Sequence, residues 1–125
     1  MKKLLFIPFL FVCSMVIGQS SKIIGTPIKI GNLEVAQNDF PKTMSWSAAV
    51  KACADLGGGW RLPTKDELNL MYLNEDKIGA VASNSYWSST EDGNGNAWWL
   101  SFGFGFQGYG GKNDVDFFVR AVRAF

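Results

Sequence analysis

The chain has 125 residues, with 12 basic and 11 acidic side chains, a formal net charge of +1 and no histidine. This near-neutral balance provides no extended basic field for nucleic acid or an anionic membrane surface. The absence of histidine excludes Ser-His-Asp triads, Cys-His pairs and His-ligated zinc.

Residues 1–18 have the pattern of a secretory signal peptide. Two lysines precede an apolar stretch over residues 4–17, and Gly18 supplies a small residue before a cut at Gln19. The stretch of 14 residues is shorter than the roughly 20 that a membrane-spanning helix needs. We therefore predict export. Taking these 18 residues from 125 leaves 107, with 10 basic and 11 acidic side chains, enough for one domain.

Cys13 offers a minor alternative, because lipoproteins are cut just before a cysteine that is then lipidated. The bulky Val12 stands where a small residue is expected, so cleavage before Gln19 is favoured. Either way, the exported chain cannot form a disulfide between Cys53 and another cysteine of its folded domain.

Residues 19–26 are predicted to be a polar leader, and residues 27–125 a single domain. Residues 28–36 (IKIGNLEVA) alternate in polarity and break at Gly31-Asn32, which predicts a first strand or a hairpin. The polar stretch that follows, AQNDFPKT, is expected to be a loop.

The period then changes to that of a helix, with Ser45 as N-cap and Gly57 as the left-handed stop. A buried small hydrophobe is favoured at Cys53 over a reactive thiol, because free cysteines are most often buried. The apolar face combines residues at spacings of three and four, with Ala49 as a neighbouring alternative: Trp46, Val50, Cys53 and Leu56.

The stretch GGGWRLPTKDEL, residues 57–68, contains the glycines and lysine of a phosphate-binding loop. It lacks the Gly-Lys pair that such a loop requires, so a corner between two elements is favoured. Trp60 and Leu62 fit a short buried strand, and Thr64 with Glu67 forms a capping box that starts a second helix. The inward face of this helix is expected to consist of Leu68, Met71 and Tyr72.

From Tyr86 onward the pattern predicts strands, which makes the domain α+β. Residues 96–109 fit one long strand or a hairpin that turns at residues 103–105 and pairs residues 98–102 with 106–109. Glycines on both sides of Phe104 favour the hairpin. The last segment, 116–125, places Arg120 and Arg123 on opposite faces. At least one of them is expected to pair with a carboxylate, and Glu67 and Glu91 are the candidates.

Three motifs occur together: WRLPT at 60–64, YWSST at 86–90 and VRAVR at 119–123. The chain resembles the DUF1566 family, also described as the C-terminal domain of the Legionella collagen-like protein, and it is similar to the Fibrobacter-type paralogous domains. The resemblance implies a C-type-lectin-like fold, with two helices flanking a small twisted antiparallel sheet and long loops. It implies scaffold roles for Trp60, Arg61, Pro63, Thr64, Glu67, Trp87, Arg120 and Arg123.

The resemblance also implies an explanation for Cys53. Many relatives carry a cysteine where this chain has Ala121, and its partner lies in the first helix at the place of Cys53. Half of that pair is therefore missing here.

The function implied for the family is binding or adhesion on an exported protein, with sugar or glycosaminoglycan recognition suggested for the type. Exposed aromatic rings stack on flat sugar faces, and polar side chains fix their orientation. We therefore predict a noncatalytic module without cofactor, whose loops at 91–114 contact a glycan or a surface protein; a protein-interaction scaffold is the alternative. The candidate residues are Trp99, Gln107, Tyr109, Lys112, Asn113 and Asp114.

Two further kinds of site are weaker predictions. Asp92, Asn94 and Asn96 repeat like the first half of a calcium loop, but a tight turn explains them better and no metal site is predicted. A hydrolase would need a pair of loop carboxylates, drawn from Glu91, Asp92, Asp114 and Asp116.

Overall fold

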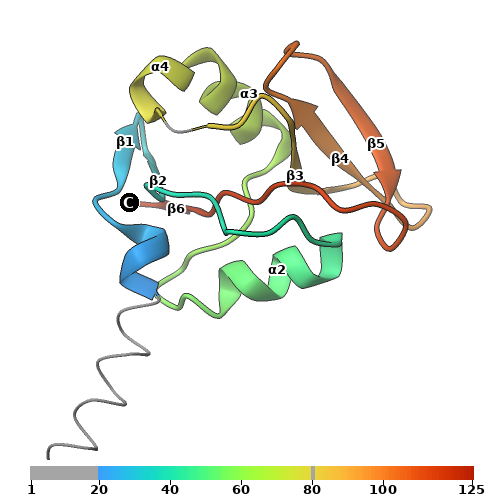
Figure 1. The fold of residues 1–125 in the computed structure, drawn as a ribbon, viewed down its shortest axis with the longest axis horizontal. Helices are drawn as coiled ribbons and strands as arrows, with labels where there is room; N and C mark the ends of the chain where they lie inside the picture. Colours follow the sequence, from blue (N-terminus) through green and yellow to red (C-terminus); the bar gives the residue numbers. More distant parts are fainter. Residues whose placement is uncertain (1–19, 80) are drawn as a thin grey trace, which may run out of the picture.

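A computed structural model describes residues 20–79 and 81–125, and it contains two three-stranded antiparallel sheets (Figure 1). The first sheet joins the two ends of the domain in the order β1-β2-β6, and the second has the order β3-β4-β5. The strands are β1 (Ile28–Ile30), β2 (Leu33–Val35), β3 (Ser85–Glu91), β4 (Asn96–Ser101), β5 (Gln107–Gly111) and β6 (Val122–Ala124).

The predicted signal peptide and the alternative lipid site at Cys13 lie outside the described residues. Residues 20–24, at the start of the described chain, are helical. Among the described residues, no helix has both the length and the apolar character that crossing a membrane requires.

The predicted hairpin over residues 28–36 is confirmed. Ile30 faces Leu33 across the turn, where Gly31 has a φ of 58°. The C-terminal segment adds β6 to this hairpin, and Val35 lies opposite Val122. Strand β6 is shorter than the predicted segment 116–125, because Phe117 bridges to Met44 rather than to one continuous neighbouring strand.

Helix α2 (Trp46–Ala54) begins at the predicted N-cap, where the Ser45 hydroxyl accepts a hydrogen bond from the Ala48 amide. Its buried residues are Ala49 and Cys53, whereas Val50 is exposed. The sequence predicts Val50 on the inner face of the helix, but in the structure Ala49 is buried there instead. Burial raises the pKa of the Cys53 thiol to about 12, so the side chain stays protonated, as expected of a small core residue.

The predicted corner after α2 is confirmed. Gly57, Gly58 and Gly59 all have positive φ, between 62° and 85°, a region that L side chains rarely adopt. The corner leads through the buried Trp60 and Leu62 into helix α3 (Lys65–Leu73).

The capping box that starts α3 is also confirmed. The Thr64 hydroxyl accepts from the Glu67 amide, and the Glu67 carboxylate accepts from the Thr64 amide at 2.9 Å. Both oxygens of the same carboxylate accept from Arg61, at 2.7 and 3.0 Å. Leu68 and Met71 are buried as predicted, and the short helix α4 (Glu75–Ile78) follows.

The second sheet separates two cores, because successive residues of a strand point to opposite faces. Tyr86 and Leu100 enter the core that contains Leu68 and Met71 of α3. The alternate residues of β3 and β4 enter the core that contains Ala49 and Cys53 of α2. Figure 1 shows α2 and α3 on opposite sides of the molecule. The fold therefore has two small sheets between its helices, where the sequence suggested one.

The hairpin register is confirmed for β4 and β5. Trp98 lies opposite Tyr109 and Leu100 lies opposite Gln107, and the turn lies between Ser101 and Phe106. Gly105 has a φ of 83°, and a Cβ at that position would come within 2.6 Å of the Tyr72 ring. The glycine that follows Phe104 is therefore required both for the turn and for its contact with α3.

The two late arginines both form ion pairs, but not with the carboxylates named from the sequence. Arg120 pairs with Asp39 at 2.7 Å, and Arg123 pairs with Glu34 at 2.9 Å. Glu67 and Glu91 were the wrong partners, because Glu67 closes its own capping box and Glu91 pairs with a lysine. The true partners are distant in sequence and lie on the N-terminal hairpin and the loop after it.

The ion pair of Arg120 lies at the centre of a buried network. The Arg120 side chain is 1% exposed, and it also donates to the Ala36 carbonyl at 3.1 Å. The second oxygen of Asp39 accepts from the Tyr86 hydroxyl at 2.6 Å, and the Ala82 amide donates to that hydroxyl. Burial, followed by the hydrogen bond to Asp39, raises the pKa of Tyr86 above its ordinary value. The network ties three separate segments together: the loop after β2, the stretch from Ala82 to Tyr86, and the C-terminal segment.

We expect Asp39→Asn to lower the free energy of unfolding by about 3 kcal/mol, because it leaves a buried guanidinium without its counter-charge. Urea unfolding of the purified chain measures this change. Asp55→Asn is the matched control, since Asp55 pairs with Lys51 on the surface and such pairs contribute about 0–1 kcal/mol. Equal effects of the two substitutions would contradict the central role of the buried pair.

We expect Ala121→Cys to form a disulfide with Cys53, because both residues are fully buried in the same core. The oxidised variant should unfold with a free energy raised by roughly 2–4 kcal/mol, and reductant should remove the gain. Thiol counting in denaturant and urea unfolding measure the two effects. Two free thiols after oxidation would show that the pairing implied by the resemblance is wrong.

We expect the contribution of Glu67 to stability to depend on pH. The hydrogen bonds from Arg61, and then the Thr64 amide, hold the pKa of Glu67 below its ordinary value. Its contribution is therefore present above the unfolded pKa of about 4.3 and is lost as pH falls through the lower folded value.

Glu67→Gln should accordingly cost about 1 kcal/mol at pH 7, discounted for partial exposure, and almost nothing at strongly acidic pH. Urea unfolding across this pH range is the measurement. The exposed Glu75→Gln serves as the control substitution. A constant loss for Glu67→Gln at every pH would refute the assignment.

Candidate functional site

The β4–β5 hairpin presents an aromatic face on the side of the sheet where α3 lies. Trp98 and Tyr109 are cross-strand partners, and their ring centroids are 5.3 Å apart at an interplanar angle of 75°. Lys65, in the first turn of α3, places its ammonium 3.7 Å from the centroid of the Trp98 ring. The Gln107 side chain joins them by donating to the Lys65 carbonyl at 3.4 Å. We call Lys65, Trp98, Gln107 and Tyr109 the aromatic face.

The aromatic face combines a rigid apolar surface with hydrogen-bonding groups. Tyr109 is 57% exposed, and Trp98 is half-buried because Lys65 covers part of it. Cations over a tryptophan ring are held by the electrostatic attraction of the ring face. The geometry therefore suits a ligand that stacks on Tyr109 while hydrogen-bonding to its hydroxyl or to the Gln107 amide.

Two more aromatic rings are exposed at the tip of the same hairpin. Phe104 is 79% exposed and Phe106 is 57% exposed, and their rings stack at 5.7 Å with an interplanar angle of 9°. The Ser101 hydroxyl accepts from the Phe104 amide and fixes the turn. Phe104 and Phe106 are called the hairpin tip below. Neither ring has a polar group, so this tip offers an apolar contact only.

Two residues predicted for the site lie on the opposite face of the hairpin. Trp99 packs against Phe117 at 5.7 Å, and a Cβ at Gly108 would lie 2.5 Å from its ring. Lys112 places its ammonium 4.4 Å from the centroid of the Trp46 ring and forms an ion pair with Glu91. Trp99 and Lys112 therefore lie on the side of α2.

The six predicted residues thus lie in three different places in the structure. Gln107 and Tyr109 meet on the aromatic face, and Trp99 and Lys112 lie behind it. The remaining pair, Asn113 and Asp114, is exposed in the turn after β5, where the Asp114 amide donates to the Gly111 carbonyl. Only Gln107 and Tyr109 of the predicted set are brought together on the aromatic face.

Sequence reasoning missed Lys65, Trp98 and the hairpin tip. The signal for Trp98 was present, because adjacent tryptophans in a strand must face opposite ways, but nothing local shows which one faces α2. The turn glycines around Phe104 could have indicated that its ring is exposed. Lys65 could not have been found, because it approaches Trp98 through tertiary packing alone.

The residues predicted to be structural make contacts within the frame. Arg123 lies 4.7 Å from the centroid of the Trp60 ring, the Trp87 indole donates to the Met44 carbonyl, and the Pro63 carbonyl accepts from Ser89. Arg61, Thr64 and Glu67 hold the start of α3, and Arg120 holds the buried network described above.

The loop carboxylates lie at the end of β3, in the turn after it and in the segment after β5. Glu91 pairs with Lys112, and the exposed Asp114 and Asp116 follow β5. Asp92 donates its amide to the Asn96 carbonyl at 2.9 Å in the turn between β3 and β4, which confirms the turn interpretation of that stretch. Within residues 20–79 and 81–125, no three His, Cys, Asp or Glu side chains form a cluster of metal-binding size.

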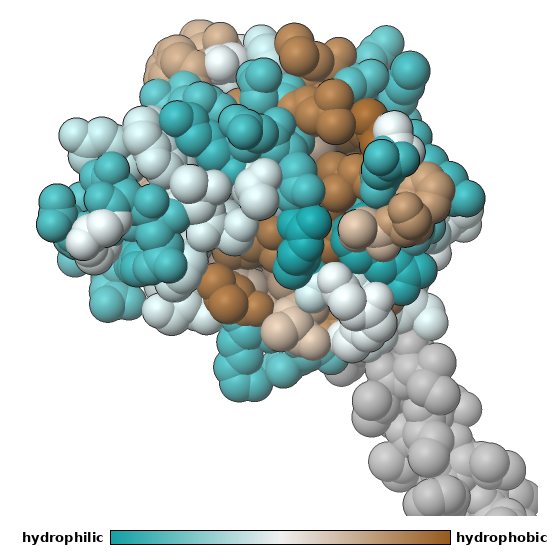
Figure 2. Space-filling view, turned by 180° about the vertical axis from the view of Figure 1, so that it is seen from behind, coloured by the Kyte–Doolittle hydropathy of each residue, from teal (hydrophilic) through white to brown (hydrophobic). Residues whose placement is uncertain are grey.

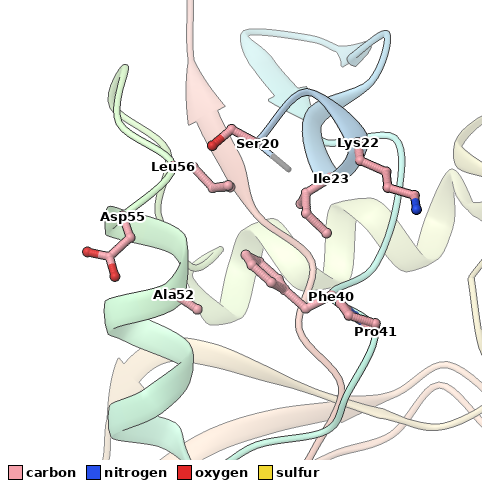
Figure 3. A pocket seen from close by; sticks show the side chains of 8 residues that line it. All are labelled: Ser20, Lys22, Ile23, Phe40, Pro41, Ala52, Asp55 and Leu56. Atoms are coloured by element: carbon pink, nitrogen blue, oxygen red, sulfur yellow. The ribbon is translucent and has the colours of Figure 1, made fainter. Parts of the chain in front are cut away.

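A pocket of about 590 Å³ lies beneath the helical residues 20–24 (Figure 3). The side chains of Ile23, Phe40 and Leu56 line its interior, whereas the charged ends of Lys22 and Asp55 point away from it. The Asp55 carboxylate is held by Lys51 at 2.7 Å. The pocket therefore lacks the converging polar groups that orient a ligand, and the aromatic face is the better candidate site.

Figure 2 shows the molecule from behind. Apolar residues reach the surface along the upper edge and in a band through the middle of this face, and hydrophilic residues lie on either side. Exposed apolar groups of this kind are common on single domains, so a site must be argued from particular side chains.

Comparison with solved structures supports the fold. The chain is similar to botrocetin, with a TM-score of 0.60 at 10% identity over 81% of this chain and 98% of that chain. It is equally similar to EMS16, described as an antagonist of the collagen receptor integrin alpha2beta1, with a TM-score of 0.60 at 10% identity over 79% and 97%. No curated protein sequence matches the chain.

At this identity the two structures establish the fold, which is C-type-lectin-like and α+β as predicted. The family model described as the Lcl C-terminal domain matches residues 27–123, which cover the two sheets, α2, α3 and the aromatic face. The chain therefore belongs to the Lcl C-terminal domain family.

Proposed function

We propose that this protein is a noncatalytic, exported binding module that recognises its ligand with the aromatic face of the β4–β5 hairpin. The observation that carries the proposal is the exposed Tyr109 ring beside Trp98, flanked by the Lys65 ammonium and the Gln107 amide. Such a combination stacks on the apolar face of a sugar ring and hydrogen-bonds to its hydroxyl groups.

The ion pairs elsewhere in the domain support a binding role rather than catalysis. Glu67, Glu34 and Asp39 each hold an arginine, and Glu91 holds a lysine. These carboxylates therefore stabilise the frame. Hydrolysis by the loop carboxylates remains the weakest of the functions considered.

Export is proposed from the leading sequence, where two lysines, an apolar stretch and Gly18 form the pattern of a signal peptide. The Cys13 alternative would place the same domain on a lipid anchor. In both cases the aromatic face would act outside the cytoplasm.

A protein ligand is the second candidate, and the hairpin tip favours it. Phe104 and Phe106 are exposed without any polar group of their own, which suits an apolar patch on a protein better than a sugar hydroxyl. One protein of the same fold, EMS16, is described as an antagonist of a protein receptor. The two candidates use neighbouring parts of one hairpin and can be separated by mutation.

A glycan array followed by titration calorimetry tests the first candidate. Tyr109→Ala should weaken binding about 10-fold, equivalent to about 1.4 kcal/mol, because it removes the stacking ring. Phe125→Ala is the matched control, since Phe125 is 58% exposed and lies at the C-terminus. Equal losses for both variants would remove the aromatic face from the proposal.

A pull-down from the surface fraction of the native host tests the second candidate. Phe104→Ala combined with Phe106→Ala should abolish capture of a protein partner while leaving any glycan binding intact. If the unmodified chain binds neither a glycan nor a surface protein, the proposed function is wrong. Hydrolysis of a generic glycoside that disappears in Glu91→Gln would instead favour an enzyme.

A further inference from the structure

Strand β5 is the outer edge of the second sheet. Among the described residues, β4 is its one neighbour, and Figure 1 shows β5 as the outermost strand on that side of the molecule. An edge strand presents backbone N–H and C=O groups that another strand can pair with. Some backbone groups of β5 are therefore free to pair with another strand.

The register between β4 and β5 decides which backbone groups face outward. The Ser101 amide donates to the Phe106 carbonyl and the Lys112 amide donates to the Gly95 carbonyl, so these two pairs are hydrogen-bonded pairs of the ladder. Antiparallel ladders alternate such pairs with non-hydrogen-bonded ones. Residues 108 and 110 therefore also bond to β4, and residues 107, 109 and 111 direct their N–H and C=O groups away from it. Of these groups, the Gly111 carbonyl already accepts from the Asp114 amide at 3.2 Å, so the open part of the edge is centred on Gln107 and Tyr109.

Apart from its last residue, which the turn at Asp114 contacts, this edge lacks the devices that usually prevent strand addition. Gln107–Gly111 contains no proline and no charged residue, and its pairing with β4 runs without a bulge. Gly108, Gly110 and Gly111 carry no side chain that would keep another backbone away. Native edges are commonly protected by lysine, proline, a bulge or a covering loop.

We propose that β5 pairs with β5 of a second copy of this chain, antiparallel, about a two-fold axis at Tyr109. In this register, residues whose backbone N–H and C=O groups point away from β4 lie opposite residues of the same kind in the second copy. Tyr109 then meets Tyr109 of the second copy, and Gln107 meets Gly111 of the second copy. The strand is uncharged, so the two copies bring no like charges together at the seam.

The side chains favour a second copy over an unrelated strand. Tyr109 lies on the same face as Trp98, so the two-fold pairing would create one continuous row of four rings across both copies. The two aromatic faces would become one surface, although the pairing itself does not depend on the proposed ligand.

Sedimentation of the protein recovered from expression of the full chain tests the proposal. We expect a dimer that dissociates detectably when the protein concentration falls below a value on the order of 0.1 mM. Tyr109→Lys and Tyr109→Glu should each raise the dissociation constant at least about 10-fold, because each sets two like charges opposite one another. A 1:1 mixture of the two variants should restore the dimer, because the opposite charges then meet at the axis.

Tyr109→Cys provides a second measurement that does not depend on charge. Directly opposed hydrogen-bonded residues have Cα atoms about 5.5 Å apart, within the range that a disulfide spans. Oxidation should therefore cross-link two copies through residue 109. Leu73→Cys, at an exposed residue of α3, is the control and should not cross-link. The native Cys53 is buried and will not interfere.

Three results would overturn the proposal. One is a monomer at every concentration up to about 0.1 mM. Another is a dimer that neither Tyr109→Lys nor Tyr109→Glu weakens. The third is capture of an extended peptide of another sequence along β5, with the chain itself monomeric, since the edge would then serve a different partner. The sedimentation experiment contains no ligand, so failure of the dimer and failure of the proposed function are distinguished by separate measurements.

Discussion

The buried guanidinium of Arg120 is the constraint on which the fold depends. A buried cation is costly unless a carboxylate and further hydrogen bonds replace its water. Asp39 and the Ala36 carbonyl provide these contacts, and Asp39 also accepts a hydrogen bond from the Tyr86 hydroxyl. Because these groups come from the loop after β2, from β3 and from the C-terminal segment, satisfying one charge fixes three parts of the chain relative to one another.

The use of arginines and tryptophans inside the frame also explains why the hairpin is available for binding. The frame uses Arg61, Arg120 and Arg123 for internal ion pairs and places Trp60 and Trp87 in its core. The β4–β5 hairpin extends beyond this frame, with one edge and part of one face uncovered. Its exposed rings are therefore held on a rigid support, which lowers the entropic cost of ordering them when a ligand binds.

Local patterns succeeded where the physics is local. The Ser45 cap, the capping box of Thr64 with Glu67 and the turn after Gly103 each involve residues within a few positions of one another, and each was confirmed. The ion-pair partners of the late arginines were missed, because Arg120 and Asp39 are 81 residues apart. The aromatic face was found only in part for the same reason.

The sequence by itself determined the fold class and family, the corner after the first helix, the hairpin register and the neutral, buried state expected of Cys53. These follow from glycine conformations, caps and hydrophobic periodicity, which act over a few residues. Only the tertiary structure decided that Trp98, rather than Trp99, faces α3 beside Lys65, and that β5 has an open edge. Those outcomes depend on which faces of the sheet the helices cover, and that is set by packing between segments far apart in the chain.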